Sequence, residues 1–241
     1  MLGMNRSITA GLAVLVAVAL ATFLAAACNG GGGGDGGGSG DAALGELAAL
    51  AEGALELRVG KVTYKVTTEG DGEAFEGEWL LARRPPDSRF EFSGTADGEE
   101  FRTIIISADG RSYLCVSRSE EQRCFETESP EADTEAMALL LDVPRAIVDG
   151  IGDVELASKT QRLVAGEDAT CFAVSSAKAG LEDVVICFSE DGQLLYLQTE
   201  VEGARSTFEA TSVSTDVTDE DFVPPYEIEA QPSPAPGTPS P

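Results

Sequence analysis

The chain has 241 residues, 43% of them hydrophobic, and its 42 acidic and 16 basic residues give a formal net charge of -26. This length can build one β domain with a sizeable core and appendages. So acidic a surface repels phosphate backbones, which excludes nucleic acid as a partner. The chain has no histidine, which excludes Ser-His-Asp and Cys-His catalysis and imidazole metal ligands.

Residues 1–27 have the order of a bacterial export signal, with a positive charge at Arg6, a mostly apolar run and small residues at its end. The residues Ala25-Ala26-Ala27 before Cys28 resemble the lipobox of bacterial lipoproteins, whose cysteine is acylated and becomes the mature N-terminus. Most lipoboxes carry leucine where this chain has Ala25. The alternative is an uncleaved anchor, because the apolar run is about long enough to span a bilayer.

The glycine-rich segment 28–40 favours lipidation, since a flexible tether of this kind holds a domain off a membrane. We therefore predict a signal peptide over 1–27 and a palmitate-type lipid anchor on Cys28. The body of the protein is then extracytoplasmic and attached to the bacterial cell membrane.

A helix is expected next, capped by Asp41 and running to about Leu57. Its apolar stripe at helical spacing comprises Leu44, Leu47, Ala51 and Ala54.

Alternating apolar and polar residues then predict about six antiparallel strands up to residue 125. A turn at Asp71-Gly72 sets Tyr64 opposite Trp79 and begins an apolar inner face. Later turns at Asp97-Gly98 and Asp109-Gly110 bring further residues onto that face, namely Phe90, Ile105 and Leu114.

The same register points Ile104 and Ile106 to the other side of the sheet. This outer face must therefore be covered, or the strand must be central and buried on both sides.

Four cysteines remain when Cys28 is set aside, an even set that suits an oxidising compartment. A hairpin that turns between Ser119 and Glu120 places Cys115 opposite Cys124, and one that turns near Ala179 places Cys171 opposite Cys187. Directly opposed residues lie within disulfide range, so we predict these two bonds. A metal site is disfavoured because the chain has no CxxC motif.

Ser129-Pro130-Glu131 reads as the start of a helix that Pro144 breaks, and Pro144 begins another short turn through Val148. A strand over 155–164 follows, and then the hairpin that contains Cys171.

The stretch Val184–Val213 predicts three strands joined by two-residue turns at Asp191-Gly192 and Glu202-Gly203. Folding at these turns gives the facing pairs Phe188 with Leu195, Ile186 with Leu197, and Leu197 with Phe208. The opposite face is mixed, with Cys187, Tyr196, Gln198, Thr207 and Glu209.

Past Phe222 the proline-rich sequence VPPYEIEAQPSPAPGTPSP cannot build a core and is expected to be disordered. We place the folded domain at 41–228 and a disordered tail at 229–241.

No catalytic constellation is evident, so we expect no enzyme activity, metal or cofactor. The acidic residues between Asp216 and Asp221 lack EF-hand spacing, which favours a solvated loop over a calcium site. The Ser175-Ser176-Ala177-Lys178 stretch fits S-x-x-K but lies at a hairpin end, where serine acyl-transferases use a helix.

The order of elements is a helix, about six strands, a helical excursion and about five more strands. This order resembles the LolA fold, which includes the carriers LolA and LolB, the sensor RseB and the mycobacterial lipoproteins LppX and LprG. The mycobacterial branch is the most similar, through the lipobox-like start, DGQLLYLQTE, GARSTFEATSV and the closing DEDFVPP. The resemblance implies a mainly β, unclosed half-barrel of about eleven antiparallel strands, with helices over a concave face that holds acyl chains.

The expected function is therefore lipid binding or carriage by an envelope lipoprotein, whose partner is a lipid or the acyl chain of another lipoprotein. The candidate lining of the cavity comprises Tyr64, Trp79, Phe90, Ile105, Leu114, Phe172, Ile186, Leu197 and Phe208. The alternatives are an RseB-like sensor or interaction module, and a structural surface lipoprotein whose sheet interior is filled by its own side chains. The sequence specifies neither the lipid nor a protein partner.

Overall fold

The structure is a computed structural model that describes residues 40–56, 59–70, 74–96, 98–119, 121–127, 142–178, 181–201 and 203–229. By its internal contacts the chain divides after Asp41, and the fold described here is that of the unit that begins at Ala42.

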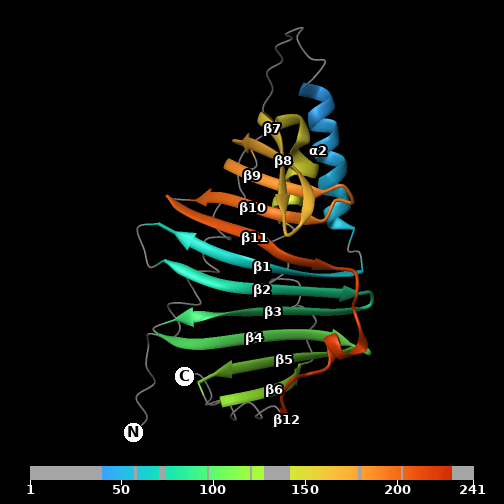
Figure 1. The fold of residues 1–241 in the computed structure, drawn as a ribbon, viewed down its shortest axis with the longest axis vertical. Coiled ribbons are helices and arrows are strands. Elements are labelled where there is room, and N and C mark those ends of the chain that lie inside the picture. Colours follow the sequence, from blue (N-terminus) through green and yellow to red (C-terminus); the bar gives the residue numbers. More distant parts are fainter. Residues whose placement is uncertain are drawn as a thin grey trace, which may run out of the picture. The chain divides into compact units, whose positions relative to one another are not determined.

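One large sheet dominates this unit (Figure 1), and its strands follow the order β12-β6-β5-β4-β3-β2-β1-β11-β10-β9-β8-β7. The bounds are β1 Gly60–Glu69, β2 Phe75–Arg84, β3 Asp87–Ala96, β4 Glu99–Ala108, β5 Arg111–Arg118, β6 Glu121–Thr127, β7 Glu155–Val164, β8 Glu167–Ser176, β9 Leu181–Ser189, β10 Leu194–Val201, β11 Ala204–Ser214 and β12 Ile228–Glu229. The 12-stranded sheet is open, with β12 at one end and β7 at the other. Its pairs are antiparallel except β12 with β6, which confirms the expected unclosed, mainly β architecture.

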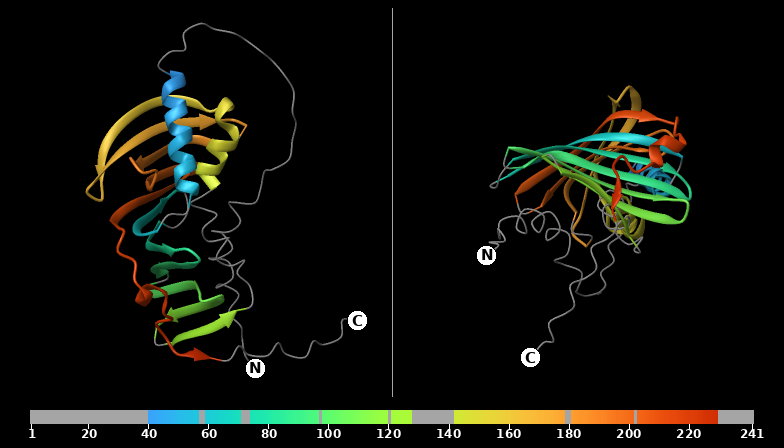
Figure 2. Two further views of the ribbon diagram at one scale, coloured as in Figure 1. Left: turned by 90° about the vertical axis from the view of Figure 1, so that its right-hand side faces the viewer. Right: turned by 90° about the horizontal axis from the view of Figure 1, so that it is seen from below.

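The helix α2 (Gly40–Leu55) and a second helical stretch over 142–150 lie against the same face of the sheet, over its β7–β11 half (Figure 2). Leu47, Ala51 and Ile147 are fully buried in one apolar cluster with the side chains of that face. We call this face the inner face. α2 begins at Gly40, so Asp41 lies in the first turn and is not the cap that the sequence predicted.

The predicted helix from Ser129 to Val148 is described only in part. Residues 128–141, including the expected cap and Pro130, lie outside the described residues, as does Leu57. The sequence predicts a break at Pro144 and a short turn from there through Val148. The described helix instead spans 142–150 and includes Pro144, so the break is wrong at this position, and a 3-10 turn (Ile151–Asp153) follows.

The strand registers confirm most of the predicted pairs. Tyr64 pairs with Trp79, Ile186 with Leu197, and Leu197 with Phe208. Cys115 bonds Cys124 and Cys171 bonds Cys187, each pair directly opposed across a hairpin as predicted.

One predicted pair is wrong, because Phe188 faces Leu194 and not Leu195. The loop after β9 has three residues, since the Ser189 N–H donates to the Gln193 carbonyl at 2.9 Å. Gly192 occupies the left-handed region in this loop, with φ 80°. A β-bulge between Leu194 and Tyr196 absorbs the extra residue, which is why the Ile186–Leu197 pair is still correct.

The segment after β11 is ordered through Glu229, so the predicted disorder past Phe222 is wrong for Val223–Glu229, and the tail boundary at 229 falls inside strand β12. The segment descends across the ends of several strands to reach β6 (Figure 1). Phe222 is buried in a second apolar cluster with Ile104 and Ile106, both fully buried on the outer face. The expected cover over these two isoleucines is therefore supplied by the chain's own C-terminal segment.

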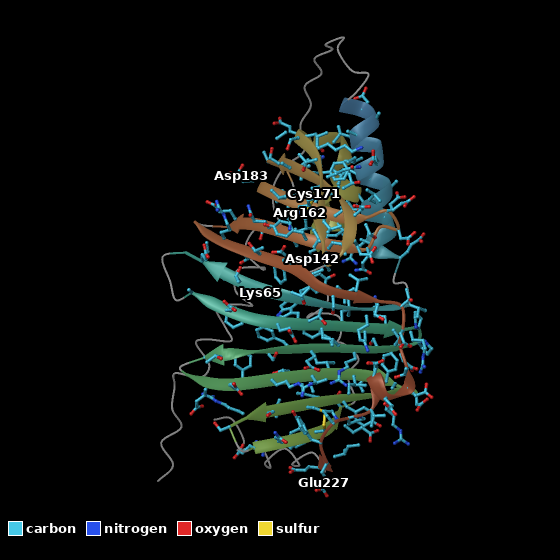
Figure 3. The ribbon with its side chains drawn as sticks, in the orientation of Figure 1. Lys65, Asp142, Arg162, Cys171, Asp183 and Glu227 are labelled. Carbon is cyan, nitrogen blue, oxygen red and sulfur yellow. A yellow bond between two sulfur atoms is a disulfide. The ribbon has the colours of Figure 1, made fainter. Side chains whose placement is uncertain are left out.

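The sheet curls strongly at its β7 end. Arg162 of β7 reaches the outer face of β10, where its guanidinium carbon lies 4.0 Å from the centre of the Tyr196 ring and its Nη2 pairs with Glu209 of β11 at 3.1 Å (Figure 3).

Candidate functional site

All nine predicted lining residues lie on the inner face. Cross-strand pairs join them in rows, because directly opposed residues project to the same side of a sheet. One row runs through Phe172, Ile186, Leu197 and Phe208, a second joins Tyr64 to Trp79, and a third runs through Phe90, Ile105 and Leu114.

The rows differ in how they are covered. Phe172, Ile186 and Leu197 are at most 1% exposed and belong to the cluster that contains the buried residues of α2. This half of the inner face is therefore filled by the protein's own side chains, as the structural alternative expects.

Tyr64 belongs to the same core. Its hydroxyl donates a hydrogen bond to the Leu194 carbonyl at 2.8 Å and accepts one from Gln193 Nε2 at 3.3 Å. Burial raises the pKa of Tyr64, and the bond from Gln193 opposes this shift only in part. The hydroxyl ties β1 to the start of β10 and has a structural role.

The half of the inner face formed by β2 to β5 is less covered. Ile105 and Leu114 are only half-buried, and so are the neighbouring apolar side chains Phe75, Phe92, Phe101 and Phe125. Six apolar inner-face side chains of this half are therefore partly open to solvent. Such a surface recruits other apolar material, since each exposed Å² forgoes about 25 cal/mol of stabilisation.

Trp79 stands at the border between the two halves. Its ring centre lies 5.0 Å from that of Phe90, 5.7 Å from that of Phe92 and 5.0 Å from that of Phe208, all in edge-to-face geometry. The aromatic group extends through Phe92 to Phe75 at 5.5 Å.

Glycines make room for this group. A Cβ on Gly77 would lie 2.5 Å from the ring of Phe75, and one on Gly94 would lie 3.0 Å from the same ring. The Phe75 ring therefore lies over Gly77 of β2 and Gly94 of β3, where any larger side chain would displace it.

A polar groove of about 500 Å³ lies on the outer face, between β1–β4 and the segment after β11. Its central residue, Glu91, accepts hydrogen bonds from Arg89 Nη2 at 2.7 Å and from Arg102 Nε at 2.5 Å. Arg89 also donates through Nη1 to the Asp221 carbonyl at 3.0 Å, and Lys61 pairs with the Asp221 carboxylate at 2.8 Å. These bonds attach the C-terminal segment to the sheet.

Two carboxylates in this groove, Glu91 and Asp221, have lowered pKa values. Burial alone would raise the pKa of Glu91, but the hydrogen bonds and charges of Arg102 and Arg89 outweigh it and hold the pKa below its usual value. Asp221 behaves in the same way, because Lys61 and Thr218 outweigh its burial and lower its pKa. Sequence reasoning missed this ion cluster, although the outward alternation of Arg89 and Glu91 could have indicated it.

The acidic stretch that was expected to be a solvated loop is structured in part. Asp219–Phe222 forms a 3-10 turn, in which Asp219 pairs with Arg84 at 2.6 Å and Asp221 accepts from the Thr218 N–H at 2.9 Å. Among the described residues, no group of three Cys, Asp or Glu side chains is placed to hold a metal ion. Lys178 of the S-x-x-K stretch pairs with Asp153 at 2.7 Å.

Fold and site together define an open antiparallel half-barrel with helices on part of its inner face, the architecture that the resemblance to LolA-like proteins implied. Within the described residues, no helix has the length and hydropathy needed to cross a membrane. No family model matches the chain, and no curated protein matches it.

Solved structures of similar arrangement exist, all at low identity. The chain is similar to MucB in the MucA/MucB complex of Pseudomonas aeruginosa (17% identity, 74% of this chain, 61% of that chain, TM-score 0.46). It is also similar to the lipoprotein LppX of Mycobacterium tuberculosis (11%, 72% and 98%, TM-score 0.46) and to LprF of Mycobacterium bovis (10%, 72% and 95%, TM-score 0.40). The chain spans about three fifths of the MucB chains that it matches. These likenesses are too distant to assign a function.

Proposed function

We propose that this protein is a membrane-anchored envelope lipoprotein that binds acyl chains on the inner face of β2–β5. The observation that carries the proposal is the group of half-buried apolar side chains around Ile105 and Leu114, beside the buried Trp79. An acyl chain laid along this face would bury that surface without displacing Phe172, Ile186 and Leu197.

Trp79 is the only tryptophan, so its emission reports on this face alone. Adding a phospholipid with a brominated acyl chain to the delipidated protein is expected to quench that emission saturably. Leu114→Asp is expected to weaken the quenching about tenfold, because a carboxylate beside the acyl chain must be desolvated. Leu197→Asp is unsuitable, since Leu197 is 1% exposed and its replacement would unfold the domain.

Lipid extraction of the natively purified protein, followed by mass spectrometry, completes this test. No saturable quenching, together with no lipid in the extract, would leave a structural or sensor role. In the sensor case a stable complex with a membrane protein would be found instead.

The membrane attachment is a separate part of the proposal. The small residues before Cys28 and the glycine tether after it support acylation of this cysteine. Metabolic labelling with a fatty-acid analogue is expected to mark the wild-type chain and not Cys28→Ala. Equal labelling of the two would show that Cys28 is not the attachment point.

A further inference from the structure

Within the described part of the chain, the indole N–H of Trp79 has no hydrogen-bond acceptor. The side chain is 7% exposed, and Nε1 is buried without a hydrogen-bond partner among the residues that the structure describes. The ring is surrounded by Phe90, Phe92 and Phe208, which offer only the weak acceptor of an aromatic face.

The hydroxyl of Tyr64, the cross-strand neighbour of Trp79, is not hydrogen-bonded to this N–H. Tyr64, paired with Trp79 across β1 and β2, directs its hydroxyl to the Leu194 carbonyl and Gln193. Buried indole N–H groups normally have an acceptor. An N–H that is removed from water without gaining one destabilises the fold by its full desolvation cost. A phenylalanine would fill an apolar core position without that cost.

We propose that Trp79 donates its indole N–H to an oxygen of the bound lipid, an ester carbonyl or a carboxyl group at the head of an acyl chain. This inference rests on the proposed function and narrows it: the site takes acyl esters or fatty acids in preference to plain hydrocarbons. Phe90, whose ring lies edge-on to Trp79, pairs with Ile105, which pairs with Leu114, so the acyl chain then runs from Trp79 over the half-buried Ile105 and Leu114.

A single tryptophan gives a single indole signal in a ¹H–¹⁵N spectrum of the labelled full chain, which makes the test direct. The chain is kept in a steroid-glycoside detergent, which has neither an acyl chain nor a carbonyl group. It is titrated with methyl palmitate and, separately, with heptadecane, while the methyl signals of Ile105 and Leu114 report whether either ligand occupies the face. We expect both ligands to shift the methyl signals and only the ester to move the indole proton downfield.

The outcomes separate the inference from the function that it rests on. If both ligands shift the methyl signals but the indole proton responds to neither, or equally to both, the role of Trp79 is overturned and lipid binding still stands. Methyl signals that respond to neither ligand would overturn both.

Variants supply a second readout by titration calorimetry. Trp79→Phe is expected to weaken methyl palmitate binding about tenfold, which is the worth of one hydrogen bond of about 1.4 kcal/mol, and to change heptadecane binding less than twofold. Phe92→Leu is the matched control, because it removes a neighbouring ring but no hydrogen-bond donor. It should weaken the binding of both ligands by the same factor. If Trp79→Phe loses affinity equally for both ligands, Trp79 has a packing role only.

Discussion

Glu91 shows how a single residue links the sheet to the C-terminal segment. Two arginines hold it, and one of them, Arg89, also binds the Asp221 carbonyl. Arg89 and Glu91 have side chains only 11% and 12% exposed, so the pair is shielded from solvent more than a surface ion pair is. Losing Glu91 would leave two neighbouring guanidinium groups without their shared acceptor.

We predict that Glu91→Gln lowers the free energy of unfolding by about 1–3 kcal/mol at pH 7, the usual worth of hydrogen bonds to a charged group. The pKa of Glu91 is lower in the folded protein than its usual value, so its contribution is present above the unfolded pKa of about 4 and is lost as the pH falls through the folded value. Urea unfolding at pH 7 and at pH 3 is therefore expected to show a difference between variant and wild type that shrinks in acid.

Glu76→Gln serves as the control, because the Lys65–Glu76 pair is 51% and 71% exposed and its loss should change stability by less than about 0.5 kcal/mol. A Glu91→Gln effect as small as the control, or one that grows in acid, would contradict this account of the cluster.

Gly192 shows how two elements are held together. It has φ 80° in the loop after β9, and a Cβ there would lie 3.0 Å from the Cα of Gly53 in α2. The helix thus approaches the loop closely at a pair of glycines. Gly203, in the next hairpin, has φ 79° but open space around it.

This contrast yields a prediction at the scale of elements. Gly192→Ala is expected to cost about 2–4 kcal/mol, because left-handed strain and a steric clash with α2 add together. Gly203→Ala carries the strain alone and is expected to cost about 1–2 kcal/mol. Thermal and urea unfolding would compare the two, and equal losses would show that α2 can move away from the loop without cost.

Sequence reasoning succeeded where local turn chemistry determines register. The Glu202-Gly203 turn was sufficient to predict the pairs of β10 with β11, and the opposed cysteines those of β8 with β9. The alternation around Tyr64 predicted the inner face. It failed at Leu194, because whether Asp191-Gly192 closes a two- or three-residue loop depends on packing against α2.

The C-terminal segment could not be predicted for a different reason. Its proline-rich composition lacks the pattern of a strand, and its order comes from partners more than 100 positions away, such as Lys61 for Asp221. The same holds for the site: the residues of the inner face could be listed, but only the fold shows that Leu197 is sealed under helices whereas Leu114 is half-buried.

At the scale of the whole sheet, the two halves of the inner face differ in what buries them. Under α2 and the 142–150 helix the side chains are sealed, whereas around β3–β5 they are half-buried. A ligand that covers the second half stabilises the native state by an amount that rises with the logarithm of its free concentration, about 2.7 kcal/mol at 100 times Kd. This stabilisation should be seen first in the strands that it touches, since open sheet regions exchange their amide protons through local opening.

We therefore predict that palmitate, added to the delipidated protein, slows amide hydrogen exchange in β3–β5 more than in β8–β10. The β8–β10 strands are already covered by helices and linked by the Cys171–Cys187 bond, so their exchange is limited by larger openings and should respond only through global stability. Exchange measured by mass spectrometry with and without palmitate gives the comparison, with Leu114→Asp as the variant in which the β3–β5 effect is lost. Slowing confined to β8–β10 would place the ligand beneath the helices and would make Ile105 and Leu114 ordinary surface residues.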